Sequence, residues 1–149
     1  MTTRIMRIPT LVRVAGKPIG RNIHHDPRSQ NFRVKRTVAE PHSQFHAATN
    51  RKALPQYELG GCVGFSVAQA FNCSPFNMHL TEEDAKNAYH LATMDDPFPG
   101  MWPPDDTGSD GLSGMKAAVK LGWCKSFSNC FDIDDVIGAL QKGPGITGT

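Results

Sequence analysis

The sequence lacks any long apolar run. Its 149 residues contain no stretch of about 18 consecutive apolar residues, so no membrane-spanning helix is expected. The first seven residues interrupt their apolar positions with Arg4 and Arg7, unlike the core of a secretory signal peptide. The net charge of +2 is too small to indicate a partner. We therefore expect a chain without a membrane partner, long enough to bury a core of its own.

Cysteine is scarce and never closely paired. The four cysteines are Cys62, Cys73, Cys124 and Cys130. They form no Cys-x-x-Cys pair, and no histidine stands at zinc-finger spacing from them. His42 and His46 are four residues apart, but their irregular context beside Pro41 argues against a metal pair. We expect free thiols in a reducing compartment, with no metal or cofactor, although the spacing leaves a Cys124–Cys130 disulfide open.

Basic residues gather in the N-terminal part of the chain. Residues 1–40 carry nine lysines and arginines against two acidic residues, whereas residues 41–149 carry seven against twelve. Phe32 is the only aromatic residue of this basic arm, so base stacking has little support and a nucleic-acid partner is not expected. We expect the arm to be solvated or to dock on the acidic body of its own chain, and the alternative is a protein assembly joined through the arm.

Apolar spacing predicts four helices in the second part of the chain. They begin at Cys62, near Thr81, at Leu112 and after Asp132, and the last two end at Gly122 and at Gly143-Pro144. The expected buried faces are Ala85, Ala88, Tyr89 and Ala92 in the second helix, Val119 among others in the third, and Ile133, Val136, Ile137 and Leu140 in the fourth. We divide the chain into an extended arm, residues 1–50, and a helical subdomain, residues 51–149.

The remaining segments are predicted to form short strands, turns and loops. We expect strand pieces within residues 4–14, a turn over 16–20, extended or turn chain over 24–28 and the start of a strand over 145–149. Residues 95–106 contain four prolines and form a loop, in which the paired acids Asp95-Asp96 and Asp105-Asp106 are expected to be solvated. His79 and His90 are most simply surface residues.

The segment from Gln56 to Ser66 contains the candidate catalytic residues. Cys62 stands in the first turn of a predicted buried helix, where backbone N–H groups and the helix dipole stabilise a thiolate. A thiolate is the nucleophile of acyl transfer. Gln56 lies six residues upstream, where its amide can donate a hydrogen bond to a developing oxyanion beside the Cys62 backbone N–H.

This segment resembles the motif of the papain-like cysteine peptidases, matched in register by Gln56, Gly60, Cys62, Phe65 and Ser66. The order of the later segments is similar too, so the resemblance covers residues 24–149. The stretch His25-Asp-Pro-Arg28 looks like that of compact, disulfide-poor bacterial and phage members. The resemblance implies an α+β fold, of which this chain holds the helical half with an extended N-terminal arm, while the strand-rich half is missing or truncated.

The resemblance also implies roles for individual residues. Cys62 would be the nucleophile and Gln56 the oxyanion donor, while Gly61, Gly108 and Ser109 would line the substrate site. The implied function is hydrolysis of peptide bonds in a peptide or protein substrate.

The sequence departs from the family beside the nucleophile and in its lack of a general base. Gly61 and Val63 replace the usual neighbours of the nucleophile, and Leu59 stands in place of an extra cysteine, which fits a reduced bacterial cytoplasm or a phage particle. The family's base is a histidine more than about 100 residues after the cysteine, yet no histidine follows His90. We expect a further segment or a second chain to supply it. The alternative is a catalytically inactive structural or interaction protein, such as a phage virion component.

Overall fold

The computed structural model describes residues 27–35, 40, 42–50 and 52–146, and the backbone of two short strands. The strands β1 (Arg13–Val14) and β2 (Lys17–Pro18) pair antiparallel, with Arg13 opposite Pro18. A 3-10 helix, η1 (Pro27–Phe32), is followed by four α-helices: α1 (Cys62–Phe71), α2 (Glu82–Asp95), α3 (Gly111–Lys120) and α4 (Ile133–Leu140). The described part of the chain is therefore mainly helical.

Some of the N-terminal predictions need correction or lie beyond this description. Lys17 and Pro18, predicted in a turn, form β2 because Lys17 pairs with Val14. Pro27 and Arg28, predicted to be extended or turn chain, begin η1. The strand pieces predicted before residue 13, the pair His24-His25, and residues 147–149 lie outside the described residues.

Side-chain caps fix the starts of three α-helices, each at the predicted place or, for α3, one residue before it. Thr81 and Asp84 form a reciprocal capping box at α2, and the carboxylates of Asp110 and Asp132 accept backbone N–H groups at the starts of α3 and α4. The third helix is followed by Gly122 at φ 73°, a left-handed conformation that favours glycine. By contrast α1 follows Gly61, which has no side chain to cap it.

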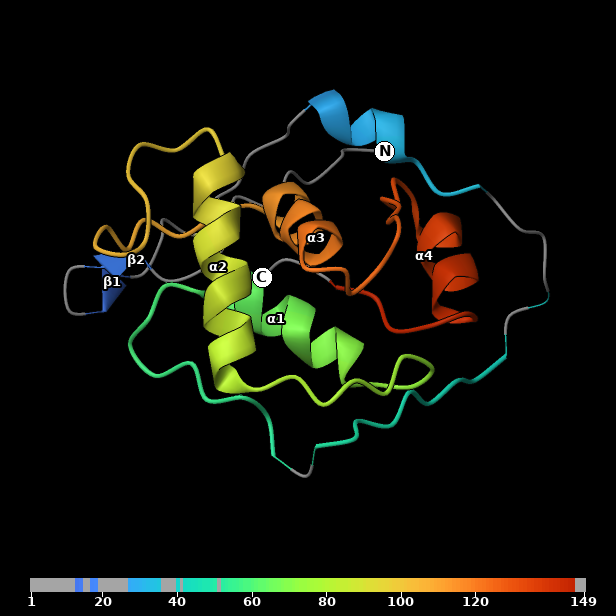
Figure 1. Ribbon diagram of the computed structural model, residues 1–149. Helices are drawn as coiled ribbons and strands as arrows, with labels where there is room; N and C mark the ends of the chain where they lie inside the picture. The colour runs from blue at the N-terminus through green and yellow to red at the C-terminus, as the bar shows by residue number, and fades with distance from the viewer. Residues whose placement is uncertain are drawn as a thin grey trace.

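The core lies where α1, α2 and α3 pack together, near the centre of Figure 1. The second helix contributes the fully buried Ala85, Ala88, Tyr89 and Ala92, the apolar face expected from the sequence. The first helix lies close to α2 at Gly64, where an added Cβ would stand 2.4 Å from the Ala85 carbonyl oxygen. Only glycine permits this approach, so Gly64 sets the spacing of the two helices.

The buried face predicted for α4 is wrong. Ile133 is 68% exposed and Leu140 37% exposed, while the only buried residue of α4 is Asp135. The helix lies to one side of the three-helix core, so its apolar stripe lacks a partner helix among the described residues (Figure 1). Val119, predicted to be buried in α3, is likewise 36% exposed.

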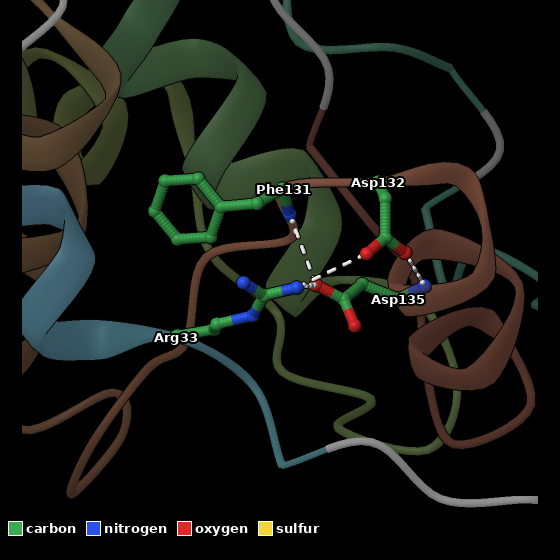
Figure 2. A network of polar contacts seen from close by, with 4 residues as sticks. All are labelled: Arg33, Phe131, Asp132 and Asp135. Carbon is green, nitrogen blue, oxygen red and sulfur yellow. Dashed lines mark hydrogen bonds and ion pairs between the residues drawn. The ribbon is translucent and has the colours of Figure 1, made fainter.

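The N-terminal segment 27–35 lies against the body of the protein. Arg33 pairs with Asn129 in a parallel bridge, and the Phe32 ring stacks on Phe127 at 4.7 Å. The Arg33 guanidinium donates to Asp132 and Asp135 at 3.0 and 3.2 Å, as Figure 2 shows. These contacts place this part of the basic arm on an acidic patch of its own chain.

Residues 47–49 also lie along the body. Ala48 bridges to Cys73, and the Thr49 hydroxyl donates to the carbonyl oxygens of Asn72 and Met78 at 2.9 and 3.0 Å. Irregular chain on both sides of α1 is therefore held by hydrogen bonds at the end of that helix.

The close packing of α1 on α2 predicts that Gly64→Ala destabilises the protein. The new methyl group would overlap backbone atoms, which cannot rotate away, so we expect a loss of about 2–3 kcal/mol in unfolding free energy. The matched control is Gly111→Ala in α3, where an added Cβ meets nothing within 4 Å. The control should keep or slightly raise stability. Equal urea midpoints for the two variants would contradict the assigned packing.

The Arg33 contacts predict a second effect on stability. The side chain of Asp135 is 1% exposed, so removing the guanidinium leaves a buried carboxylate with less compensation. Because Arg33 itself is 55% exposed, we expect Arg33→Ala to cost only about 1 kcal/mol. Urea unfolding would measure this loss against Lys125→Ala, at an exposed lysine. A cost no larger than that of the control would show that the ion pair adds nothing.

Candidate active site

Cys62 is the first residue of α1 and is half-buried. Burial raises the pKa of its thiol, the backbone N–H groups of Val63 and Cys62 lower it, and the nearby Asp106 carboxylate raises it again. The net direction is upward. The helix start therefore provides donors for a thiolate, but burial and the Asp106 carboxylate favour the neutral thiol.

Gln56 begins a tight turn that leads to Cys62. The Leu59 N–H donates to the Gln56 carbonyl at 3.3 Å, and the Gln56 amide Nε2 donates to the Leu59 carbonyl at 2.6 Å. Tyr57, inside this turn, has φ 53° and an 82% exposed side chain. A left-handed conformation at a non-glycine residue costs about 1 kcal/mol or more, so other contacts must hold this turn.

A hydrogen-bond network ties the chain before Cys62 to α2 and to the loop before α3. The two carboxylate oxygens of Asp106 each accept the Gly60 N–H at 3.0 Å. The buried Tyr89 hydroxyl donates to Asp106 at 2.8 Å and accepts the Gly108 N–H at 2.9 Å. Burial and the bond to Asp106 raise the pKa of Tyr89 well above its usual range. We call Gly60, Tyr89, Asp106 and Gly108 the Asp106 network.

The glycines of the predicted site lie close to this network. An added Cβ at Gly60 would stand 2.6 Å from an Asp106 oxygen, and one at Gly61 would stand 3.1 Å from the Tyr89 ring. Gly108 has φ 74°, which favours glycine. The network therefore joins Gly108 to Gly60, which directly precedes Gly61 and Cys62. The sequence predicted that Gly61, Cys62 and Gly108 share a site.

The remaining predicted residue, Ser109, lies away from the surface. It is 2% exposed, and its hydroxyl lies beside the Asp96 carboxylate. Burial raises the pKa of Asp96, while the Ser109 hydroxyl and the Phe98 N–H lower it. A substrate contact from Ser109 stays a prediction.

The loop between α2 and α3 differs from the solvated loop expected from its prolines and acids. Asp96 and Asp106 are both partly buried and bonded to backbone N–H groups. Trp102 packs on Tyr89 with ring centroids 5.4 Å apart, and its carbonyl bonds to the His90 ring. His90, predicted at the surface, is therefore half-buried and anchors the loop to α2.

The described histidines lie at other sites. His42 bonds to Gln44, His46 to the Leu140 carbonyl and His90 to the Trp102 carbonyl, while His79 is exposed. Within the described ranges, no group of three or more histidine, cysteine or acidic side chains could hold a metal ion. All four cysteines are free thiols. None of these contacts places one of the four histidines as a general base for Cys62.

An open groove of about 430 Å³ runs along one face of α1. Ser66, Gln69 and Ala70 line it from the helix, and Leu54 and residues 144–146 line it from the irregular chain. Ser66 stands one helical turn after Cys62, on the same face of α1. Cys73, and not Cys62, is the cysteine that lines this groove.

Sequence reasoning missed Tyr89 and Asp106 as members of the site. Tyr89 was assigned to the apolar face of α2, which is correct for its ring but leaves its hydroxyl in need of a partner. A buried tyrosine hydroxyl usually finds such a partner, and the acid pair Asp105-Asp106 was the available signal.

The burial of Cys62 predicts the pH dependence of its reaction with iodoacetamide. Only the thiolate reacts, and the pKa of Cys62 is raised in the folded chain. The half-maximal alkylation rate should therefore occur at higher pH in the folded chain than in urea, where the pKa returns to about 8.5. Mass spectrometry of the Cys62 peptide over a pH series measures both curves. A folded midpoint below the unfolded one would contradict the prediction.

Comparison of the chain with models of known protein families, with curated proteins and with solved structures finds no match. Among the described residues, every helix is too short or too polar to cross a membrane. The interpretation of the site therefore rests on its residues and their geometry.

Proposed function

We propose that the chain is the helical part of a papain-like thiol hydrolase that cleaves peptide bonds with Cys62 as its nucleophile. The observation that carries this proposal is the place of Cys62, the first residue of α1, behind a glycine that provides no side-chain cap. The N–H groups of Cys62 and Val63 act on the sulfur and favour its thiolate. The same end of the helix is suited to bind a substrate oxyanion.

In this mechanism Gln56 is the second oxyanion donor. Its amide has two N–H bonds, of which one is directed at the Leu59 carbonyl. We assign the other to the substrate oxyanion. The turn that bonds Gln56 to Leu59 through both main chain and side chain fixes this amide directly before the Gly60-Gly61 pair that leads into α1.

The reaction also requires a base, which we propose comes from a histidine in a second chain or a further segment. The base takes the thiol proton, and the thiolate sulfur bonds to the scissile carbonyl carbon. The C–N bond then breaks, and the amine leaves with the proton that the base returns. Water hydrolyses the thioester and regenerates the thiol. Such a base would approach the half-buried Cys62 thiol at the start of α1.

A comparison of two reactions at Cys62 tests this function on the chain itself. A peptidyl p-nitrophenyl ester transfers its acyl group to a thiolate through an oxyanion, and its leaving group needs no proton. Iodoacetamide alkylates the same thiolate without an oxyanion. The ratio of acylation rate to alkylation rate, which we call the acyl preference, therefore reports oxyanion stabilisation independently of thiolate fraction.

We expect the acyl preference of Cys62 to exceed that of Cys73 in the same chain by about tenfold or more. Gln56→Ala should lower the acyl preference of Cys62 by about tenfold and leave its alkylation rate unchanged, because only acylation develops an oxyanion. Peptide mass spectrometry after timed quenching measures each rate, and Gln44→Ala, at an exposed glutamine, is the matched control. Equal acyl preferences at Cys62 and Cys73 would overturn the proposed function.

That result would favour a second candidate, a catalytically inactive peptidase-like protein that acts through interactions, for example in a phage particle. The observation in its favour is the upward shift in the pKa of Cys62, caused by burial and by Asp106. A protein of this kind would keep the fold around Cys62 without oxyanion stabilisation. We rank it second because it leaves the uncapped start of α1 without a role.

A further inference from the structure

The chain before Cys62 is held from outside its own turn. Gly60 donates its N–H to Asp106, which stands 46 residues later in the sequence, with both carboxylate oxygens at 3.0 Å. No side chain at position 60 would fit, since a Cβ there would come within 2.6 Å of the carboxylate. The carboxylate therefore lies directly against the backbone that leads into α1.

The carboxylate is itself oriented by a rigid group. Tyr89 is fully buried in the core on α2, and its hydroxyl donates to Asp106 at 2.8 Å. The Gly108 N–H completes the arrangement by donating to the same hydroxyl at 2.9 Å. A buried ring with its hydroxyl bonded on two sides has little freedom, so the position of Asp106 is set by the core.

The Tyr89 ring also lies close to Gly61, the residue after Gly60. The ring would stand 3.1 Å from a Cβ at Gly61, the residue that precedes α1. Gly60 and Gly61 are thus held by the carboxylate and by the ring respectively. The turn over residues 56–59, with its left-handed Tyr57, needs such external support to keep one conformation.

We propose that Asp106 is a positioning residue for Cys62: together with Tyr89, it fixes the Gly60-Gly61 backbone and thereby the N–H groups and the Gln56 amide that receive the substrate oxyanion. This inference rests on the proposed function and adds to it a residue outside the Gln56–Ser66 segment. Asp106 does not touch the reacting atoms in this assignment. It acts through the backbone that carries them.

The test measures the acyl preference of Cys62 in variants of Asp106. Asp106→Ala removes both acceptors, so the donors lose their fixed geometry, and we expect the acyl preference to fall by about tenfold or more. Asp106→Asn retains one acceptor oxygen for Gly60 or Tyr89, so its acyl preference should lie between those of the unsubstituted chain and Asp106→Ala. Asp105→Ala, which removes the exposed neighbouring carboxylate, is the matched control and should leave the ratio unchanged.

A second measurement separates the effect of Asp106 on the backbone geometry from the effect of its charge on the Cys62 thiol. Both Asp106 variants remove the negative charge near the thiol, so both should move the pH midpoint of Cys62 alkylation downward by a similar amount. The acyl preference is independent of thiolate fraction and should distinguish the two variants. Circular dichroism confirms that each variant is folded. If Asp106→Ala does not fold, Tyr89→Phe replaces it, since the ring packing stays and only the hydroxyl is lost.

The outcomes are distinct. A high acyl preference at Cys62 in the unsubstituted chain that falls in folded Asp106→Ala, or in Tyr89→Phe, supports the inference. A high value that stays unchanged in the folded variant overturns the inference and leaves the proposed function standing. A value at Cys62 no higher than at Cys73 in the unsubstituted chain overturns both.

Discussion

The contact between α1 and α2 at Gly64 is the constraint on which the rest of the structure depends. Because position 64 has no side chain, the Ala85 carbonyl and the Tyr89 backbone come directly against α1. This approach brings the Tyr89 ring to Gly61 and its hydroxyl to Asp106. The spacing of α1 and α2 thus determines where the backbone before Cys62 lies, through one buried side chain, Tyr89.

Opposing effects meet at the Cys62 thiol. The start of α1 offers backbone N–H groups that favour a thiolate, whereas burial and the Asp106 carboxylate favour the neutral thiol. The carboxylate that orders the backbone is therefore also a charge that hinders ionisation. A cationic imidazolium beside the sulfur would offset that charge, so the proposed histidine would complete the electrostatics of the site as well as move a proton.

The sequence predicted the parts of the fold that local chemistry determines. The starts of α2 near Thr81 and of α4 after Asp132, and the small apolar face of α2, each depend on a single segment, and the structure confirms them. The face of α4 could not be predicted in this way, because an apolar stripe is buried only where another element covers it. The contacts of Asp106 could not be predicted for a similar reason, since its partners Gly60 and Tyr89 lie 46 and 17 residues away in the sequence.

The bonds from Arg33 to Asp132 and Asp135 join residues 99 and 102 positions apart. They hold segment 27–35 on α4 and the chain before it, while α1, α2 and α3 share a core without them. Closing so long a loop costs conformational entropy that these few contacts must repay. Segment 27–35 can therefore detach as a cooperative unit at a lower free energy than global unfolding, and the three-helix core would stay folded without it.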